Sequence, residues 1–546
     1  MDIVRLDLNK ATPDLPSESE IRFHVGLLAA VAALVASFVA RFVFDAPLLP
    51  ELLAQFIFAV APIWAVELAV GMLGPFAKHL AFLACVVVYS IGLIAATIGY
   101  LRYWPKPARS ISVAAFAALI WVVTIVVLMP LAGDGLFGSH LRQGALFTSA
   151  SLFVVHAVYG AALGFTASRY LERPGVGTDK IIGRRRIVRG VGYAVLAVGV
   201  YDIGKSLLGS WLQSGSGRVK RGDGVFPNIN NLAFEVTPTR DFYLVSKNAF
   251  DPQVDGRRWK LEVAGLVGDS LSLSYDDIKA LPSVEQYATL ACISNEVGGD
   301  LIGNALWRGV RLKDVLEKAG LKQGVVDIVL RASDDYADSI PLDRAMADGT
   351  LLVYEMNGEP LTSEHGFPLR LLVPGIYGMK NVKWITRIEA VDFDFKGYWQ
   401  RRGWDDRAEY KTMSRIDAPD HAVKGETTIA GIAFAGDRGV SKVEVSTDGG
   451  RTWGLADIKP ALSRFTWVLW RRVWTPGQTG RHRIAVRATD ANGVTQTSQP
   501  AAPAPSGSSG YHSVVINSDV VAEPVGANLG GSKKTGRLVG NRKRDS

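Results

Sequence analysis

Cysteine is almost absent from the sequence, and this limits how the chain can be stabilised. The 546 residues include two cysteines, Cys85 within an apolar stretch and Cys292 in the more polar second half. Because these two lie in regions of opposite character, we expect them not to pair, and the sequence excludes a disulfide framework. A lone cysteine is usually a small buried hydrophobe, so its neighbours must indicate any chemical role.

Charged residues are also scarce in the first 210 residues, where Ala, Val, Leu and Ile dominate. The formal net charge of +8 could suggest a nucleic-acid partner. However, much of the basic excess borders apolar segments or lies at the C-terminal end, where such residues set membrane topology or form a solvated tail. Because no nucleic-acid-binding motif occurs either, we expect no nucleic-acid partner.

Long apolar stretches fill the N-terminal part, approximately over 25–44, 52–74, 80–101, 111–132, 145–167 and 190–209. Most of them are long enough to cross about 30 Å of hydrocarbon at 1.5 Å per residue. The second stretch carries Gln55 and Glu67, and could instead be an amphipathic helix that lies against the bundle. The sequence therefore predicts an all-α transmembrane bundle over 1–210 with five or six spans.

The distribution of Lys and Arg predicts the orientation of this bundle. The loops 102–109 and 168–189 are rich in basic residues, whereas the loop 133–144 is nearly neutral. By the positive-inside rule the basic loops are cytoplasmic, so everything after about residue 210 is expected on the extracytoplasmic side. The stretch 184–189 also resembles a twin-arginine export signal, and a plain positive anchor explains the same residues, so the export route stays open.

Histidines in the apolar part raise a second hypothesis for the bundle. His24 and His156 lie in or at the edge of apolar stretches, and His79 and His140 lie near their ends. Two intramembrane histidines could ligate a haem, but single ones more often bond a neighbouring helix, and no paired spacing occurs here. Haem is thus a weakly supported alternative. A transporter or sensor is disfavoured because the spans lack dense charge, interrupted helices and an internal repeat.

The second half divides into segments of different pattern. A polar linker containing Gly and Ser covers 211–230. Over 231–407 the pattern mixes a helix at 312–319 with strands at 259–263, 286–292, 327–332, 369–373 and 384–392, which predicts an α+β domain. Over 408–517 only alternating strands remain, together with a hairpin turn at Asp448-Gly449-Gly450, which predicts an immunoglobulin-like β-sandwich. The last segment, 518–546, is predicted to be a disordered basic tail.

Cys292 ends an apolar strand and enters a polar, glycine-containing loop. A thiol at a strand end faces a site, and nearby cations would lower its pKa toward that of a thiolate, which suits a transition metal. Arg370, Lys380 and Lys383 surround a second glycine-containing loop, where backbone amides and cations can approach an anion such as phosphate. Together these features predict a thiolate-ligated metal held by an anionic organic cofactor.

Three segments, in this order and before a Trp-rich domain, carry a resemblance to a known family. They are TPTRDFY from Thr237, LACISNEVGGDLIGNALWRGVRLKDVL from Leu290, and HGFPLRLLVPGIYGMKNVKW from His365. The arrangement resembles the sulfite-oxidase family of molybdopterin enzymes, which includes the catalytic subunit of the periplasmic methionine-sulfoxide reductase. The resemblance covers roughly 231–517.

The resemblance implies a molybdenum–molybdopterin cofactor, two-electron oxygen-atom transfer and a homodimer formed by the second domain. It implies that Cys292 is the catalytic residue and the protein ligand of molybdenum. The positions that would line or hold the pterin and its phosphate are Thr239, Phe242, Tyr243, Ser333, His365, Arg370, Asn381, Val382 and Lys383.

Two departures from the family pattern bear on the substrate. Sulfite-oxidising members have an arginine shortly after the cysteine and a tyrosine after a Gln-Arg-Arg tract, whereas this chain has Glu296 and Trp404. Glu296 would repel sulfite, and Trp404 has no phenolic hydroxyl. We therefore expect a small S- or N-oxide as substrate, in either direction of the reaction.

No haem-binding domain adjoins the second half, so the electrons are expected from a membrane or extracytoplasmic carrier, or through the bundle. The main alternative is a non-catalytic module of the same fold that binds a ligand or partner on a membrane anchor. The intact Cys292, Arg370 and Lys383 argue against it.

Overall fold

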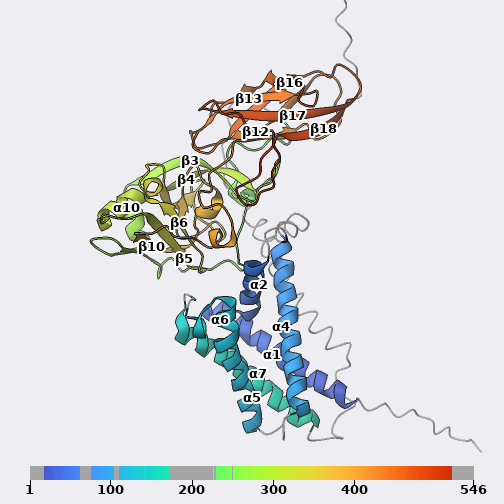
Figure 1. Cartoon of the computed structure of the whole chain (residues 1–546), viewed down its shortest axis with the longest axis vertical. Coiled ribbons are helices and arrows are strands. Elements are labelled where there is room, and N and C mark those ends of the chain that lie inside the picture. The colour runs from blue at the N-terminus through green and yellow to red at the C-terminus, as the bar shows by residue number, and fades with distance from the viewer. Residues whose placement is uncertain are drawn as a thin grey trace, which may run out of the picture.

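The structure is a computed structural model that describes residues 17–61, 65, 76–103, 110–139, 141, 143–171, 226, 229–248 and 250–518. It has a helical N-terminal region and a β-rich C-terminal region (Figure 1). The predicted span over 190–209, the basic stretch 184–189, most of the linker and the tail after residue 518 lie outside the described residues.

Four long helices of the described part are apolar enough to cross a membrane. They are α1 (Glu18–Phe44), α4 (Phe76–Tyr103), α5 (Ser110–Val123) with its continuation through the π-helical turn η1 (Thr124–Leu128) into α6 (Met129–Ala132), and α7 (Gly144–Leu171). These helices coincide with the predicted spans over 25–44, 80–101, 111–132 and 145–167.

The second predicted span begins with a short helix. α2 (Leu49–Val60) has 12 residues, which is too few to cross about 30 Å at 1.5 Å per residue. It packs against α4, and Glu51 in its first turn is buried, 3.4 Å from Arg41 of α1. α2 alone is thus too short for a complete span, and most of the rest of the predicted stretch, 62–64 and 66–74, lies outside the described residues.

Small residues allow the bundle helices to approach closely, as is common where apolar helices pack without water. A Cβ atom at Gly26 of α1 would lie 3.3 Å from the backbone of Ile94 in α4. A Cβ at Gly160 of α7 would lie 2.7 Å from the side chain of Ala117 in α5. These contacts hold the helices side by side and leave apolar side chains on the outside.

The middle part of the chain contains two sheets. The first has the order β2-β1-β10-β5-β6, with β1 (Lys260–Gly265), β2 (Leu271–Ser274), β5 (Asp327–Ala332), β6 (Ala337–Pro341) and β10 (Ile385–Val391). The second has the order β3-β4-β7-β8, with β9 also paired to β7; its strands are β3 (Ser283–Ala291), β4 (Ile302–Arg311), β7 (Leu351–Met356), β8 (Glu359–Pro360) and β9 (Arg370–Leu372). Helices α9 (Tyr275–Ala280), α10 (Leu312–Ala319) and α11 (Leu342–Ala345) join them.

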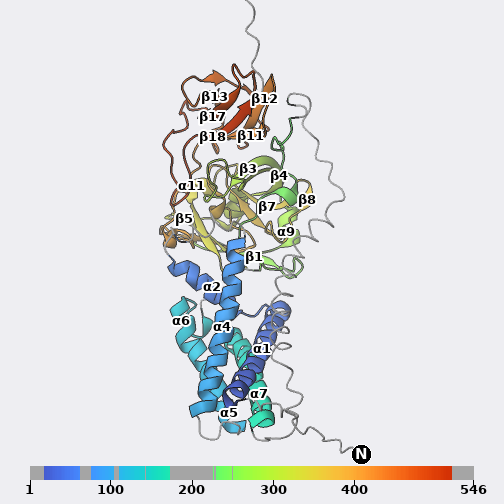
Figure 2. The ribbon, with the colours of Figure 1, turned by 90° about the vertical axis from the view of Figure 1, so that its right-hand side faces the viewer.

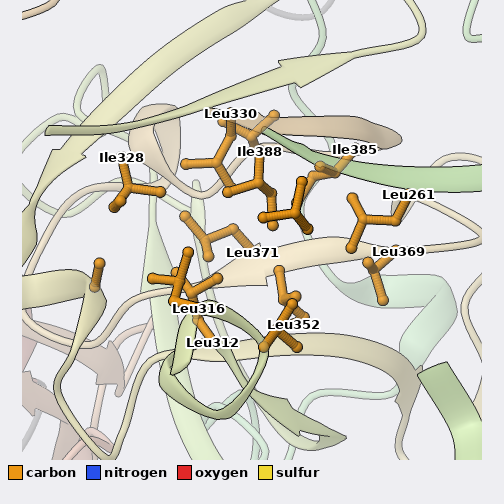
Figure 3. Packing of buried hydrophobic residues seen from close by; sticks show 14 of the residues in the cluster. Leu261, Leu312, Leu316, Ile328, Leu330, Leu352, Leu369, Leu371, Ile385 and Ile388 are labelled. Carbon is orange, nitrogen blue, oxygen red and sulfur yellow. The ribbon is translucent and has the colours of Figure 1, made fainter. Parts of the chain in front are cut away.

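One apolar core connects these two sheets. Leu312 and Leu316, one turn apart on α10, pack with Leu330 of the first sheet and Leu352 and Leu371 of the second (Figure 3). All five side chains are fully buried. Because a close-packed interior resists displacement, this core fixes the position of β9.

The last part consists of two four-stranded antiparallel sheets with a shared apolar core. One has the order β11-β12-β16-β15, with β11 (Met413–Ala418), β12 (Thr427–Phe434), β15 (Asp457–Ile458) and β16 (Val468–Trp474). The other has the order β14-β13-β17-β18, with β13 (Val440–Ser446), β14 (Gly454–Leu455), β17 (Gly480–Asp490) and β18 (His512–Ser518).

Figure 2 shows how these parts follow one another. The middle part lies against the end of the bundle formed by α2 and the start of α4, and the C-terminal sheets lie beyond it, away from the bundle. The helical region and the C-terminal sheets are therefore on opposite sides of the middle part.

Candidate active site

Cys292 directly follows β3, at the end of a long hairpin. β3 and β4 pair from Ser283–Val310 to Ala291–Ile302 without a break. The Cys292 N–H donates to the Leu301 carbonyl at 2.9 Å, and the Leu301 N–H donates to the Asn295 side-chain oxygen at 2.9 Å. The loop that joins β3 to β4 therefore holds the thiol in a defined place.

The Cys292 sulfur lies in a dry but polar environment. The residue is 8% exposed, and burial raises the pKa of its thiol. The Ser294 hydroxyl lies 2.9 Å from the sulfur, and this hydroxyl and the N–H groups of Ile293 and Ser294 lower the pKa in the opposite direction. The turn thus offers three hydrogen-bond donors to a sulfur that carries negative charge.

Three tyrosines lie near this thiol, of which Tyr377 and Tyr410 are buried and Tyr243 is half-buried. Burial raises the pKa of Tyr243 and Tyr410, and raises that of Tyr377 to about 12; a negative Cys292 raises each of them further. Tyr410 accepts a hydrogen bond from the Ala291 N–H at 2.9 Å. All three phenols are therefore neutral at physiological pH and can act as hydrogen-bond donors.

Arg370, the first residue of β9, places a buried cation close to the thiol. Its guanidinium is near enough to Tyr243 to lower the pKa of that phenol. Burial lowers the pKa of Arg370 to about 10, so it stays charged at neutral pH. One Nη donates to the His365 carbonyl at 3.1 Å, and Nε has no partner among the described residues. A buried cation without a carboxylate is suited to bind an anion.

The segment before the domain's first strand forms another wall of the site. Thr239 begins the 3₁₀ turn η4 (Thr239–Asp241), and its carbonyl lies 2.9 Å from His365 Nε2. Phe242 and Tyr243 stack with ring centroids 5.3 Å apart, and the Phe242 ring occupies the space above Gly303 of β4. Burial lowers the pKa of His365 to about 4, so the ring is neutral and its Nε2–H donates to Thr239.

Asn381 and Val382 close the loop that follows β9. The Asn381 side-chain oxygen accepts from the Val373 N–H at 2.6 Å, and its amide donates to the Tyr377 carbonyl at 3.2 Å. The Val382 side chain is buried in the core, and its carbonyl accepts from the Leu371 N–H at 2.8 Å. These two residues thus fix the shape of the loop and tie it to β9 and the core.

The two lysines of this loop have different environments. Lys383 Nζ lies 2.9 Å from the Glu364 carbonyl and 4.2 Å from the centroid of the Trp384 ring. Lys380 is buried, with Nζ 3.1 Å from an Asp338 oxygen and 2.9 Å from the Ser339 carbonyl. The expectation that Lys380 faces an anionic ligand is wrong, because its charge is neutralised by Asp338 and it ties the loop to β6.

The family follows from comparison with known proteins. Residues 248–399 match the model of the oxidoreductase molybdopterin binding domain, and residues 409–518 match that of the Mo-co oxidoreductase dimerisation domain. Sulfite oxidase of Gallus gallus is 32% identical over 320 residues, which cover 49% of this chain and 69% of that protein. The oxidoreductase YuiH of Bacillus subtilis (strain 168) is 39% identical over 155 residues, or 28% of this chain and 76% of that protein. The chain belongs to the sulfite-oxidase family of molybdopterin-dependent oxidoreductases.

For some relatives, the alignment with this chain covers only part of the relative's length. Mitochondrial sulfite oxidase of Macaca fascicularis is 36% identical over 270 residues, which cover 40% of this chain and 50% of that protein. The chain thus spans about half the length of this relative.

The family's molybdenum cofactor fits the groups found here. Cys292 offers a sulfur with three donors around it, and the unpartnered Arg370 Nε offers a cationic donor in a dry site. A pterin with a phosphate is planar, polar and anionic. It would satisfy this guanidinium and stack or hydrogen-bond along Phe242, Tyr243 and His365.

Ser333 lies at a distance from the other candidate residues, on the loop after β5. Its N–H donates to the Trp384 carbonyl at 2.9 Å, which links it to the Lys383 loop. Its hydroxyl is buried without a partner among the described residues, in a cavity that Arg41 and Glu51 of the bundle also line. Tyr243 thus lies near both Cys292 and Arg370 and stacks on Phe242, whereas Ser333 lies on the side that faces the bundle.

The two residues that depart from the family pattern lie close to the thiol turn. Glu296 is exposed in the turn after Cys292. Trp404 is half-buried and packs against the apolar cluster that contains Ile293 and Tyr377. An acidic group and an indole thus flank the approach to the turn.

Sequence reasoning missed Ser294, Tyr377 and Tyr410. Ser294 and Tyr377 lie inside two of the segments that carry the family resemblance, and a polar side chain next to Cys292 or Gly378 was an available signal. Tyr410 lies near the start of the segment that matches the dimerisation domain, outside the three motif segments, so only the fold brings it to the hairpin end.

Proposed function

We propose that this chain is a membrane-anchored, extracytoplasmic molybdenum-cofactor oxidoreductase that moves an oxygen atom to or from a small S- or N-oxide. The observation that carries the proposal is the combination of the Cys292 thiol, which has three hydrogen-bond donors around it, with the buried Arg370 guanidinium, whose Nε has no hydrogen-bond partner among the described residues. A thiolate and an anion-binding cation in one dry site are what a thiolate-ligated metal on an anionic pterin requires.

The cofactor, when bound, supplies the two-electron redox change that accompanies oxygen-atom transfer. The chain's own residues hold and tune it. Cys292 ligates the metal through sulfur, and the Ser294 hydroxyl withdraws electron density from that sulfur. Thr239, Phe242 and Tyr243 form one wall for the pterin, and neutral His365 keeps this wall in place through its bond to Thr239.

The anionic end of the cofactor requires cations and amides. Arg370 and Lys383 supply the charges, and the loop closed by Asn381 and Val382 presents backbone groups. We assign Ser333 to the same task at the far end of the pterin, because its unpartnered hydroxyl is joined to this loop through Trp384.

The approach to the site favours a neutral substrate over sulfite. The exposed Glu296 carboxylate repels a dianion, and the half-buried Trp404 offers an apolar surface beside the tyrosines. Buried neutral phenols can donate hydrogen bonds to the oxygen of an S- or N-oxide. Sulfite turnover slower than that of such an oxide is therefore expected.

The arrangement of the chain supports an extracytoplasmic catalytic part and a membrane bundle. We further propose the domain limits 1–210, 231–407 and 408–517, with a linker at 211–230 and a tail at 518–546. The two C-terminal sheets form an immunoglobulin-like sandwich, and the matched dimerisation domain supports a homodimer. Electrons come from a separate membrane or extracytoplasmic carrier.

Molybdenum content of the full chain, purified from a host that makes the cofactor, tests the proposal. We expect about one molybdenum per chain in the parent and loss of the metal-centred spectrum in Cys292→Ser. Cys85→Ala is the matched control, because Cys85 lies in α4 and should leave the metal unaffected. Well-folded parent protein without molybdenum would support the alternative, a module that binds a ligand or partner without redox chemistry.

A further inference from the structure

An aromatic side chain of the catalytic part is inserted into the end of the helical bundle. Phe250 lies with its ring centroid 5.6 Å from that of Phe42, near the end of α1, and 5.3 Å from that of Phe82, in α4. Both contacts are edge-to-face, with interplanar angles of 75° and 86°. This geometry is the favourable one for aromatic pairs, and Phe38, Leu48 and Val86 complete the pocket.

A polar seam surrounds this aromatic contact. A cavity next to it is lined from the bundle by Arg41, Asp45, Glu51 and Gln143, and from the catalytic part by Asn248, Pro252 and Ser333 to Asp335. The bundle side is internally organised, because Arg41 lies 3.4 Å from the buried Glu51 and Gln143 donates to the Asp45 carbonyl at 3.0 Å. Both halves thus contribute buried polar groups to one shared boundary.

The catalytic side of the seam is also fixed in place. Asn248, 3% exposed, donates to Asp334 at 2.7 Å, and Lys247 lies 4.0 Å from the same carboxylate. The neighbouring Ser333 N–H bonds to Trp384, next to Lys383 of the candidate cofactor loop. The segment that carries Phe250 is therefore fixed to the loop after β5, which in turn contacts the candidate cofactor loop.

If the linker were the sole connection between the two halves, no complementary pocket for Phe250 would be needed. A linker would hold the two halves in the same molecule whatever their surfaces, whereas here three rings interlock and charged groups are buried around them. We propose that the outer end of the bundle is a receptor for the catalytic domain, and that Phe250 with Asn248 and Pro252 is the segment that docks into it. The docked domain is held at the membrane surface by this contact, independently of the linker.

The test cuts the linker of the full chain after it has folded. A protease recognition sequence is introduced within 211–230, the purified protein in mild detergent is cleaved, and a tag at the N-terminus is used to recover the bundle. We expect the catalytic half to be recovered with the bundle after cleavage. In Phe250→Asp the charged side chain cannot enter the apolar pocket, so recovery should fall by roughly tenfold or more.

Two further variants keep the result interpretable. Phe42→Ala alters the pocket on the bundle and leaves the catalytic half untouched, so release in this variant cannot come from a misfolded catalytic domain. Val494→Asp puts the same charge at a 61% exposed position of the C-terminal domain and should be retained like the parent. Immediate release of the parent's catalytic half after cleavage, or full retention of Phe250→Asp, would overturn the proposal. Molybdenum content is measured separately, so a failure of docking is distinguishable from a failure of the proposed function.

Discussion

Among single residues, Ser294 has the most direct access to the chemistry, because its hydroxyl lies 2.9 Å from the Cys292 sulfur. A hydrogen bond to a charged group contributes about 1.5–3 kcal/mol, and it favours the more electron-rich state of a metal–thiolate unit. If about 1 kcal/mol of this differs between oxidation states, Ser294→Ala should lower the potential of the two-electron couple by roughly 20 mV. A redox titration of the molybdenum signal measures this, and Ser294→Thr, which keeps the hydroxyl, should stay near the parent. Equal potentials in all three proteins would contradict a tuning role.

The neutral, buried His365 makes the stability of the cofactor-free protein depend on pH. Burial first, and then the nearby Arg370 and Lys383, lower its pKa to about 4, whereas an unfolded histidine titrates near 6.5. Between pH 4 and pH 6.5 the unfolded chain binds a proton that the folded chain does not. The free energy of unfolding is therefore undiminished above about pH 6.5 and decreases as the pH falls toward 4. At about 1.4 kcal/mol per pKa unit this amounts to roughly 3 kcal/mol.

Urea unfolding between pH 4 and pH 7 tests this expectation. His365→Gln keeps an N–H donor for the Thr239 carbonyl but does not titrate, so its stability should fall less steeply than that of the parent over this range. Parallel curves for the two proteins would show that the pKa of His365 is the same in the folded and unfolded states.

At the scale of elements, strand β4 supports the segment that contains Phe242 and Tyr243, which we propose lines the pterin. A Cβ at Gly303 would lie 2.7 Å from two carbons of the Phe242 ring, a distance that real Cβ contacts do not adopt, so Gly303→Ala must displace the ring. Overpacking of this kind costs about 1–3 kcal/mol, and the shifted segment should retain less cofactor. Molybdenum content and thermal unfolding measure both effects. Gly477→Ala, at a position with no atom within 4 Å, is the control and should match the parent.

Helices and strands whose apolar residues recur with a clear period were predictable from the sequence. Elements that are short or contain glycine were not. Helix 312–319 and strand 327–332 are confirmed with the predicted ends as α10 and β5. β4 was not anticipated, although it carries Trp307, because Gly303 and Gly309 weaken the strand signal that its alternation would give. Among the site residues, the pattern predicted Cys292 and Arg370 as members of one site, and this assignment stays a prediction. Lys380 was misjudged because its partner Asp338 is 42 positions away in the sequence.

For the molecule as a whole, the order of the regions could be predicted from composition, but their contacts could not. Hydropathy separates the helical region from the β-rich one without knowledge of the fold. The insertion of Phe250 between α1 and α4, and the position of Tyr410 at the end of the β3–β4 hairpin, depend on contacts between residues far apart in the chain. Such contacts leave no local pattern to read.

The bundle's own geometry leads to an expected orientation for the whole molecule. Phe82 of α4 contacts the catalytic part, and Arg102 lies 20 residues further along the same helix, or about 30 Å at 1.5 Å per residue, which is the thickness of the hydrocarbon core. Arg102 and Tyr103, where the basic stretch begins, thus lie at the end away from the catalytic part, and the positive-inside rule predicts that this end is cytoplasmic. A cysteine placed at Val494, 61% exposed, should react with a membrane-impermeant maleimide in intact spheroplasts. A cysteine at Tyr103, 77% exposed, should react only after permeabilisation. The parent, whose two cysteines are buried, gives the background, and the reverse pattern of labelling would place the catalytic part in the cytoplasm.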